Sequence, residues 1–435
     1  MRRAVSPAIP AARPLAPPAG MRDLLYPASI MRRALGRALT DTFALWGYEL
    51  LTTPPFEHAE VMERGLSTLD RRDLVRFVEP ETGEVALLRP DITPQIARIV
   101  ATRLADRPPP FRLSYEGSVI RRRRGRARRH RQIAQAGVEH IGSNGVEADS
   151  EIIELALRAC EAVGLDAATI ELGQASIGRE ALARVPEAHR EKAAAALGRK
   201  DGKELEAALR AGDVRAADRR VLLSLLDLWG GVEVLEAADG LLTGCGPAIE
   251  RALAELVGLV DRLASVGLAH RIGIDLGELR GMSYYTGVSF TILAEGPGEP
   301  VGAGGRYDNL LGGFGRPAPA TGFAIDLDNL EWALARADRP FLVELPLRVA
   351  VLGTDADACA AVADALRRQG VSVASLPSRP EGDALAFARA WGYDAALLVS
   401  DAGVRAVRTI DGTGCDVVPW VREQIQRLAE WARAR

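Results

Sequence analysis

The stretch VIRRRRGRARRHRQIAQAGVEHIG, residues 119–142, decides the fold. Its apolar flanks predict two strands, 111–120 and 133–141, joined by an arginine-rich loop. Eight of the eleven residues from 121 to 131 are arginine. Like charges repel, so the run indicates a solvated hairpin tip, although arginine also suits phosphate or carboxylate groups. Beyond the tip, Gln135 and Glu139 lie four apart, so on a strand they face the same side as acceptors for a cationic or amide-donating ligand.

The segment LRPDITPQIAR, residues 88–98, precedes this hairpin and places Asp91 two positions before Thr93. In an extended or turning segment these side chains project to the same side, where a carboxylate and a hydroxyl suit a ligand ammonium. Pro90 and Asp91 are also good residues for a helix start, so Asp91 or Thr93 is expected to act as a cap. From this segment alone, capping is the favoured interpretation.

Two further segments follow the hairpin, LRGMSYYTGVSF at 279–290 and GAGGRYDNL at 302–310. The paired Tyr284 and Tyr285 are expected either to line a small-molecule pocket or to close a sheet edge, with their hydroxyls bonded. The second segment is predicted as a glycine-rich turn, because glycine permits close backbone approach to a neighbour or a ligand. It lacks the Gly-Lys-Ser/Thr ending of a P-loop, which disfavours a nucleoside triphosphatase of that type.

Hydrophobic periodicity organises the rest of the chain. Helices are predicted at 27–46, 91–104 and 150–163, a hairpin at 74–88, and strands at 48–52, 271–276 and 288–293. Residues 177–266 are almost entirely helix-forming and read as an insertion. After a proline-containing linker at 338–346, strands and helices alternate, which predicts a small α/β domain with a largely parallel sheet.

Composition is that of a soluble globular protein, with 48% hydrophobic residues and a net charge of −3. That charge disfavours a protein that coats nucleic acid. The four cysteines form no CxxC pair and the five histidines show no metal-ligand spacing, so neither a metal nor a cofactor is expected. Scattered cysteines suit a cytoplasmic location. No apolar run could span a membrane, and residues 1–20 are expected to be a disordered tail, a transit peptide being the weaker interpretation.

Five motifs in a fixed order resemble the class II histidyl-tRNA synthetase core. They are GMRD at 20–23, LRPDIT at 88–93, QAGVE at 135–139, RGMSYY at 280–285 and GGRYD at 304–308. The resemblance covers roughly residues 20–335 and implies an α+β fold. Its centre would be a synthetase-like antiparallel sheet flanked by helices, with a helical insertion and a small C-terminal α/β domain. The implied domains are a tail at 1–20, a core at 21–176 and 267–337, an insertion at 177–266, a linker at 338–346 and an α/β domain at 347–435 that resembles an anticodon-binding domain.

The same resemblance implies a histidine site. The residues of this chain that match the family's histidine contacts are Asp91, Thr93, Arg121, Gln135, Glu139, Arg280, Tyr284 and Tyr285. Asp91 is one methylene shorter than the glutamate of the family, and Ser283 replaces an aspartate.

Two departures from the synthetase pattern bear on activity. Arg123 stands where the family carries a glutamate that helps to hold adenine, and Asn329 stands where it carries an arginine that contacts ATP. Removing a cation from a phosphate-transfer site typically costs several kcal/mol of barrier. Asp326 and Asp328 are expected to add negative charge there. Amino-acid activation is therefore not expected, and no catalytic residues are predicted.

A histidine pocket without this machinery is similar to the regulatory subunits of short-form ATP phosphoribosyltransferase. Membership of that family implies a short catalytic partner chain, feedback inhibition by histidine in histidine biosynthesis, and a dimer formed through residues 48–55. Two alternatives stay open. The arginine-rich loop and the C-terminal domain favour a divergent histidyl-tRNA synthetase, and a paralog that binds another protein or RNA is the other. tRNA binding is not expected. Trp391 and Trp420 are predicted to be core or helix-packing residues rather than platforms for stacking bases, and the C-terminal domain is interpreted as a vestige.

Overall fold

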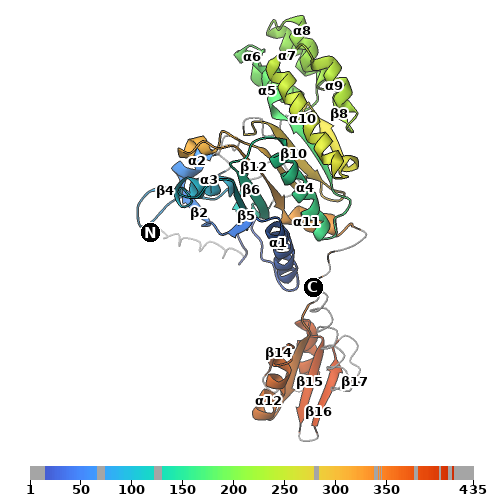
Figure 1. The fold of residues 1–435 in the computed structure, drawn as a ribbon. Helices are drawn as coiled ribbons and strands as arrows, with labels where there is room; N and C mark the ends of the chain where they lie inside the picture. The colour runs from blue at the N-terminus through green and yellow to red at the C-terminus, as the bar shows by residue number, and fades with distance from the viewer. Residues whose placement is uncertain are drawn as a thin grey trace, which may run out of the picture. The chain divides into compact units, whose positions relative to one another are not determined.

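The computed structural model describes residues 15–65, 74–121, 130–278, 284–337, 341, 343, 345–376, 381–400, 403–409 and 414–415. The chain divides into two compact units, residues 1–341 and 342–435 (Figure 1). No helix among these residues is long and apolar enough to cross a membrane.

The first unit is built on a nine-stranded sheet. Most neighbouring strands are antiparallel, but β1–β5 and β7–β9 are parallel, so the sheet predicted as antiparallel is mixed towards its two ends. In spatial order the strands are β1 (Glu49–Leu51), β5 (Phe111–Ile120), β6 (Gln132–Ile141), β12 (Ala320–Asp326), β11 (Gly302–Arg306), β10 (Val288–Leu293), β7 (Thr169–Gln174), β9 (Ile272–Asp275) and β8 (Trp229–Gly230).

The prediction of a glycine-rich turn at 302–310 is wrong for its first five residues. They form β11 in the middle of the sheet. The reason is close packing on both sides of the strand. A Cβ at Gly302 would lie 2.6 Å from the Ala324 carbonyl, and a Cβ at Gly304 would lie 2.4 Å from the Gly322 carbonyl. The glycines are therefore present for close backbone approach, as expected, but within a strand.

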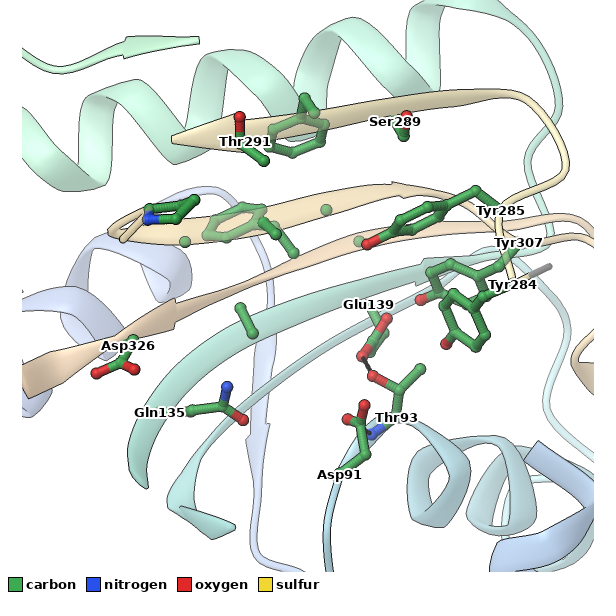
Figure 2. Close-up of a pocket in the computed structure, with 18 of the residues that line it drawn as sticks. Asp91, Thr93, Gln135, Glu139, Tyr284, Tyr285, Ser289, Thr291, Tyr307 and Asp326 are labelled. Atoms are coloured by element: carbon green, nitrogen blue, oxygen red, sulfur yellow. Dashed lines mark hydrogen bonds between the residues drawn. The ribbon is translucent and has the colours of Figure 1, made fainter. Parts of the chain in front are cut away.

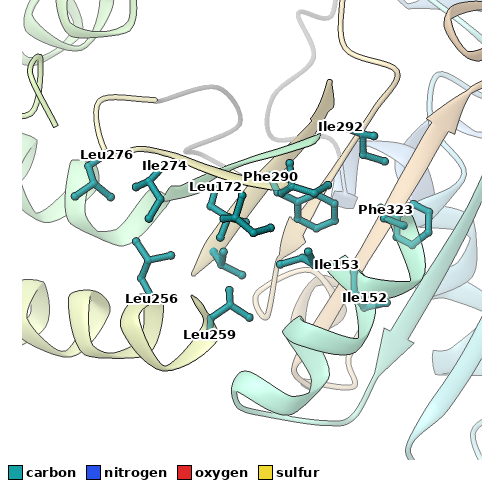
Figure 3. Close-up of a cluster of buried hydrophobic side chains, with 14 of the residues drawn as sticks. Ile152, Ile153, Leu172, Leu256, Leu259, Ile274, Leu276, Phe290, Ile292 and Phe323 are labelled. Carbon is teal, nitrogen blue, oxygen red and sulfur yellow. The ribbon is translucent and has the colours of Figure 1, made fainter. Parts of the chain in front are cut away.

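One face of the sheet carries the main hydrophobic core. α1 (Ala28–Leu45), α4 (Val146–Ala162), α10 (Pro247–Ser265) and α11 (Leu327–Leu334) contribute buried side chains to it. In Figure 3, Ile152 and Ile153 of α4 lie near Phe290 and Phe323 of the sheet, and Leu256 of α10 lies nearer Ile274 of β9. The helices predicted at 27–46 and 150–163 are thus confirmed, with the second starting earlier, at Val146.

The helix-forming stretch between the two halves of the sheet is helical apart from the short β8. It gathers at one end of the unit (Figure 1). Besides α10 it comprises α5 (Ala175–Ala183), α6 (Glu187–Gly198), α7 (Gly202–Ala211), α8 (Ala216–Ser224) and α9 (Val234–Leu242).

A three-stranded sheet of β2 (Phe56–His58), β4 (Val85–Leu88) and β3 (Val75–Val78) lies beside α2 (Ala59–Gly65) and α3 (Thr93–Thr102). Its β3–β4 pair is the hairpin predicted at 74–88. Short 3-10 turns occur at Ala269–Arg271 and Leu311–Phe314.

The second unit has a five-stranded sheet in the order β14-β13-β15-β16-β17. The first three strands are parallel and the last two antiparallel, so the predicted parallel sheet is confirmed in part. Trp391 is not a core residue, because 63% of it is exposed, but its ring lies 6.0 Å from that of Phe387, as the alternative of helix packing allows. Trp420 lies outside the described residues. The elements are β13 (Arg348–Gly353), α12 (Ala356–Arg367), β14 (Ser372–Ser375), α13 (Glu381–Ala390), β15 (Ala395–Ser400), β16 (Gly403–Arg408) and β17 (Gly414–Cys415).

Candidate functional site

Strand alternation brings the polar residues of the hairpin onto the face of the sheet opposite the core. Gln135, Gly137 and Glu139 alternate along β6 and therefore point to one side. Tyr115 pairs with Gly137, and a Cβ at that glycine would lie 2.6 Å from the tyrosine ring. The Tyr115 ring therefore lies over Gly137, between the side chains of Gln135 and Glu139.

The same face is hollow because its other strands carry small residues there. Gly322 of β12 is opposite Glu139, and Ala324 is opposite Ala303 of β11. The result is a cavity of about 350 Å³ that is lined by Asp91, Thr93, Gln135, Glu139 and both adjacent tyrosines (Figure 2). Pockets that hold small molecules measure roughly 300–1,000 Å³, so this one suits a ligand of amino-acid size.

Asp91 and Thr93 lie at the start of α3, and both line the cavity. Oδ1 of Asp91 accepts a hydrogen bond of 3.2 Å from the backbone N–H of Thr93, the first residue of the helix, whereas the N-cap residue itself is Ile92. Its Oδ2 lies 3.3 Å from Nη2 of Arg121. The Thr93 hydroxyl donates to Oε1 of Glu139 at 2.6 Å (Figure 2). The helix start thus supplies one wall of the cavity.

Buried Arg89 fixes the backbone that carries these two residues. Its Nη1 donates to the carbonyl and the hydroxyl of Thr53 at 2.9 and 2.7 Å, and its Nε donates to the Ser118 carbonyl at 2.7 Å. Burial lowers the pKa of Arg89, yet arginine stays charged in proteins. A Cβ at Gly117 would lie 2.3 Å from Nη2, so that glycine makes room for the guanidinium.

Three tyrosines form the opposite wall. The Tyr284 ring meets Tyr285 edge-on with centroids 5.3 Å apart, and it stacks on Tyr307 at 5.2 Å. Burial raises the pKa of Tyr284 and of Tyr285, so both stay neutral phenols. Sequence reasoning missed Tyr307, which is 3% exposed. The GGRYD motif contains it, but only the glycines of that motif were interpreted.

Glu139 is the most unusual group in the cavity. It is 1% exposed, and burial raises the pKa of its carboxyl well above the usual range; the Thr93 hydrogen bond lowers it and nearby Asp91 raises it. Among the described residues, Oε2 of Glu139 has no hydrogen-bond partner, and neither has Oε1 of Gln135 or the Tyr307 hydroxyl. Buried polar atoms are nearly always bonded, so these three atoms are expected to meet a polar ligand or water.

The other end of the cavity contains Asn329, one of the two residues that depart from the synthetase pattern. Oδ1 of Asp326 caps α11 by accepting from the backbone N–H groups of Asp328 and Asn329 at 2.9 and 3.1 Å. The Asn329 amide donates to the Pro300 carbonyl at 2.7 Å, and the residue is 2% exposed. No cation therefore stands at position 329.

The expectation that Asp328 adds negative charge to this end is wrong. Asp328 does not line the cavity, because it turns towards α1 and forms ion pairs with Arg22 and Arg32. Two positions apart in the sequence, Asp326 and Asp328 lie on different sides because the chain passes from strand to helix between them. Arg22 of the GMRD motif thus holds α11 against the N-terminal segment.

Arg306 of GGRYD is likewise an internal tie. Its Nε and Nη2 donate to both oxygens of buried Asp149 at 3.0 and 2.9 Å, and its Nη1 donates to Asp308 at 3.1 Å. This fork joins β11 to α4 next to Tyr307. The Arg306 guanidinium is therefore occupied by bonds within the protein, and its role is to hold β11 and α4 in place beside the site.

Seven of the eight predicted site residues line this cavity. They are Asp91, Thr93, Arg121, Gln135, Glu139, Tyr284 and Tyr285. Arg280 lies outside the described residues, as does Arg123. In the part of the chain that the structure describes, no group of histidine, cysteine or acidic side chains is arranged to hold a metal ion.

Comparison with known proteins agrees with the fold. Residues 20–330 match the family model described as histidyl-tRNA synthetase. The ATP phosphoribosyltransferase regulatory subunit of Anaeromyxobacter sp. (strain K) is 42% identical over 329 residues, which are 92% of that protein and 74% of this chain. The chain belongs to the family of ATP phosphoribosyltransferase regulatory subunits.

Two other members show how much of the chain the family covers. The regulatory subunit of Syntrophotalea carbinolica is 36% identical over 91% of this chain and 94% of its own length. A crystal structure of an ATP phosphoribosyltransferase regulatory subunit/histidyl-tRNA synthetase from Bacillus halodurans has a TM-score of 0.77 at 29% identity, covering 90% of this chain and 99% of that one. About a quarter of this chain has no counterpart in the Anaeromyxobacter member, so the family includes shorter chains.

Proposed function

We propose that this chain is the non-catalytic, histidine-binding regulatory subunit of a cytoplasmic ATP phosphoribosyltransferase. The observation that carries the proposal is one cavity in which acidic and phenolic groups for an amino acid lie together, while position 329 at its far end is a neutral, internally bonded asparagine.

The cavity offers groups for each part of free histidine. The unpaired oxygens of Gln135 and Glu139 are acceptors for an ammonium, and the Thr93–Glu139 hydrogen bond orients that carboxyl. Arg121 is a cation for the ligand carboxylate. Binding the carboxylate would weaken its 3.3 Å contact with Asp91. The phenols of Tyr284 and Tyr307 can bond an imidazole, since both rings are held by stacking. Arg280 is proposed to complete the set.

Amino-acid activation is not proposed. Attack on a triphosphate depends on positioned cations that stabilise developing charge. The described lining of the cavity also includes the acidic residues Glu171, Glu299 and Asp326, which are not groups that bind phosphates. The side-chain amide of Asn329 donates a hydrogen bond to a backbone carbonyl. A pocket with these properties binds an amino acid without consuming it.

Regulation requires a partner. The proposed partner is a short-form catalytic ATP phosphoribosyltransferase chain, which joins a dimer of this protein. Histidine would inhibit by binding one conformation of the complex better than another, since a ligand shifts an equilibrium only by its differential affinity.

The deciding experiment uses purified full-length protein. We expect titration calorimetry to show saturable histidine binding that disappears in Tyr307→Phe combined with Glu139→Gln. We also expect no histidine-dependent exchange between ATP and pyrophosphate, with an authentic histidyl-tRNA synthetase as the positive control. Co-expression with a short catalytic chain should yield histidine-inhibited ATP phosphoribosyltransferase. Robust exchange together with charging of tRNA would instead identify a divergent histidyl-tRNA synthetase.

A further inference from the structure

The tyrosine wall of the cavity is attached on two sides, to the sheet and to the helical insertion. On the sheet side, the backbone N–H of Thr286 donates to the Arg306 carbonyl at 2.7 Å, and the Thr286 hydroxyl accepts from the backbone N–H of Asp308 at 2.9 Å. These bonds fix the segment that carries Tyr284 and Tyr285 to the C-terminal end of β11.

On the insertion side, the first turns of α5 hold the same segment. The N–H of Ala175 donates to the Gly287 carbonyl at 3.0 Å. One helical turn further on, Nη2 of Arg179 donates to the carbonyl of Tyr285. This side-chain hydrogen bond joins the insertion to a residue of the cavity wall.

α5 is in turn packed against the other helices of the insertion. It contacts α6, α8 and α10, and α10 also lies against α4 of the core. If Tyr285 moves, α5 is expected to move with it. Because α5 is packed against the other helices, the displacement would pass to the insertion.

We propose that Arg179 is a positioning residue for the amino-acid site and the link through which occupancy of the cavity reaches the helical insertion. It holds the Tyr285 carbonyl, so that the Tyr284 and Tyr285 rings keep their edge-on contact at the wall. An arginine suits this place because one guanidinium can reach a carbonyl and keep further donors for neighbours. The inference rests on the proposed function, since it assigns a role in histidine binding.

The test compares three full-length variants. Arg179→Met keeps the length of the side chain and removes its donors, whereas Arg179→Lys restores one charged donor. Arg190→Met is the matched control, because Arg190 also donates to backbone carbonyls, those of Leu182 and Val185, but within the insertion and away from the cavity.

We expect Arg179→Met to weaken histidine binding about tenfold, the size of one charge-assisted hydrogen bond. Arg179→Lys should recover most of that loss, and Arg190→Met should bind as the parent does. Hydrogen exchange gives the readout that a merely structural role would not move. Histidine should slow amide exchange across 175–183 in the parent and in Arg190→Met, but not in Arg179→Met.

The outcomes separate the two proposals. If the parent protein binds no histidine, the proposed function fails, and this inference falls with it. If the parent binds histidine and Arg179→Met binds equally well with the same protection of α5, only the positioning role is overturned. If affinity falls equally in Arg179→Met and Arg190→Met, the loss reflects the stability of the insertion, and the link is likewise rejected.

Discussion

Changing Glu139 to glutamine should lower the affinity for histidine and remove the pH dependence of binding that Glu139 causes. The side chain is almost completely buried, and one carboxylate oxygen has no partner among the described residues. Losing one member of a buried charge pair costs about 2–5 kcal/mol. With 1.4 kcal/mol for each factor of ten, affinity should fall at least about thirtyfold.

The pH dependence follows from the direction of the shift. Burial, opposed by the Thr93 hydrogen bond and supported by Asp91, raises the pKa of Glu139 well above its usual range. In the free protein the carboxyl therefore keeps its proton above its ordinary pKa. A ligand ammonium favours the carboxylate, so binding releases that proton. Affinity should rise with pH, up to about tenfold per unit, until the raised pKa is passed.

Other titratable groups around Glu139 shape this profile. Tyr115, Tyr284 and Tyr285 face it, and burial keeps their pKa values above the tested range. Arg121 stays charged beside Asp91. The ligand's own imidazole also titrates, so the informative quantity is the difference between parent and variant at each pH.

Calorimetry between pH 6 and 8.5, in buffers of different ionisation enthalpy, measures affinity and proton release together. Glu116→Gln is the control, because burial also raises the pKa of Glu116, yet this residue lies near α1 and outside the cavity lining. We expect a smaller proton release and a flatter profile in Glu139→Gln alone. Equal release and equal affinity in the parent and in Glu139→Gln would refute the reasoning.

Further predictions concern stability and the division of the chain. Between the ordinary and the raised pKa of Glu139, the native state holds a proton that the unfolded chain has lost, so the free energy of unfolding should fall as pH rises, by at most about 1.4 kcal/mol per unit; denaturant melts should show this slope in the parent and not in Glu139→Gln. Gly304→Ala should destabilise the fold by about 1–3 kcal/mol, because its Cβ would meet the Phe290 ring at 2.6 Å, whereas Gly312→Ala, with nothing within 4 Å, should melt near the parent temperature. Arg306→Met should cost about 3–5 kcal/mol by stranding buried Asp149, while loss of the exposed Arg37–Asp41 pair in Arg37→Met should cost under about 1 kcal/mol; equal melting of the two would contradict the buried tie. A chain ending at residue 341 should bind histidine within about twofold of the full chain, since every described residue of the cavity lies in the first unit; a large loss would assign the second unit a part in binding.

Local rules predicted the elements of the hairpin and of the flanking helices because their signals are short-range. The spacing of Gln135 and Glu139 on β6 gave their common side, and the Pro90–Thr93 pattern gave the start of α3. The position of β11 could not be read in the same way. Glycines carry no hydrophobic signal, and the reason for Gly302 and Gly304 lies in strands that are distant in the sequence.

The site shows the same limit. The motifs named the acidic and phenolic groups, but the depth of the cavity depends on Gly322, Ala324 and Ala303, which carry no chemistry of their own. The direction of Asp328 was misjudged because its partners, Arg22 and Arg32, lie some 300 positions away. Tyr307 was missed because its stacking partner, Tyr284, comes from another segment.

The bond from Asn329 to the Pro300 carbonyl has a consequence for how such a chain could change over time. An arginine placed at 329 would have to abandon that carbonyl and enter beside Asp326, so the first step back would cost stability before it gained any reactivity. Position 123 would need its own reversal as well. The packing around Asn329 therefore opposes an arginine at that position.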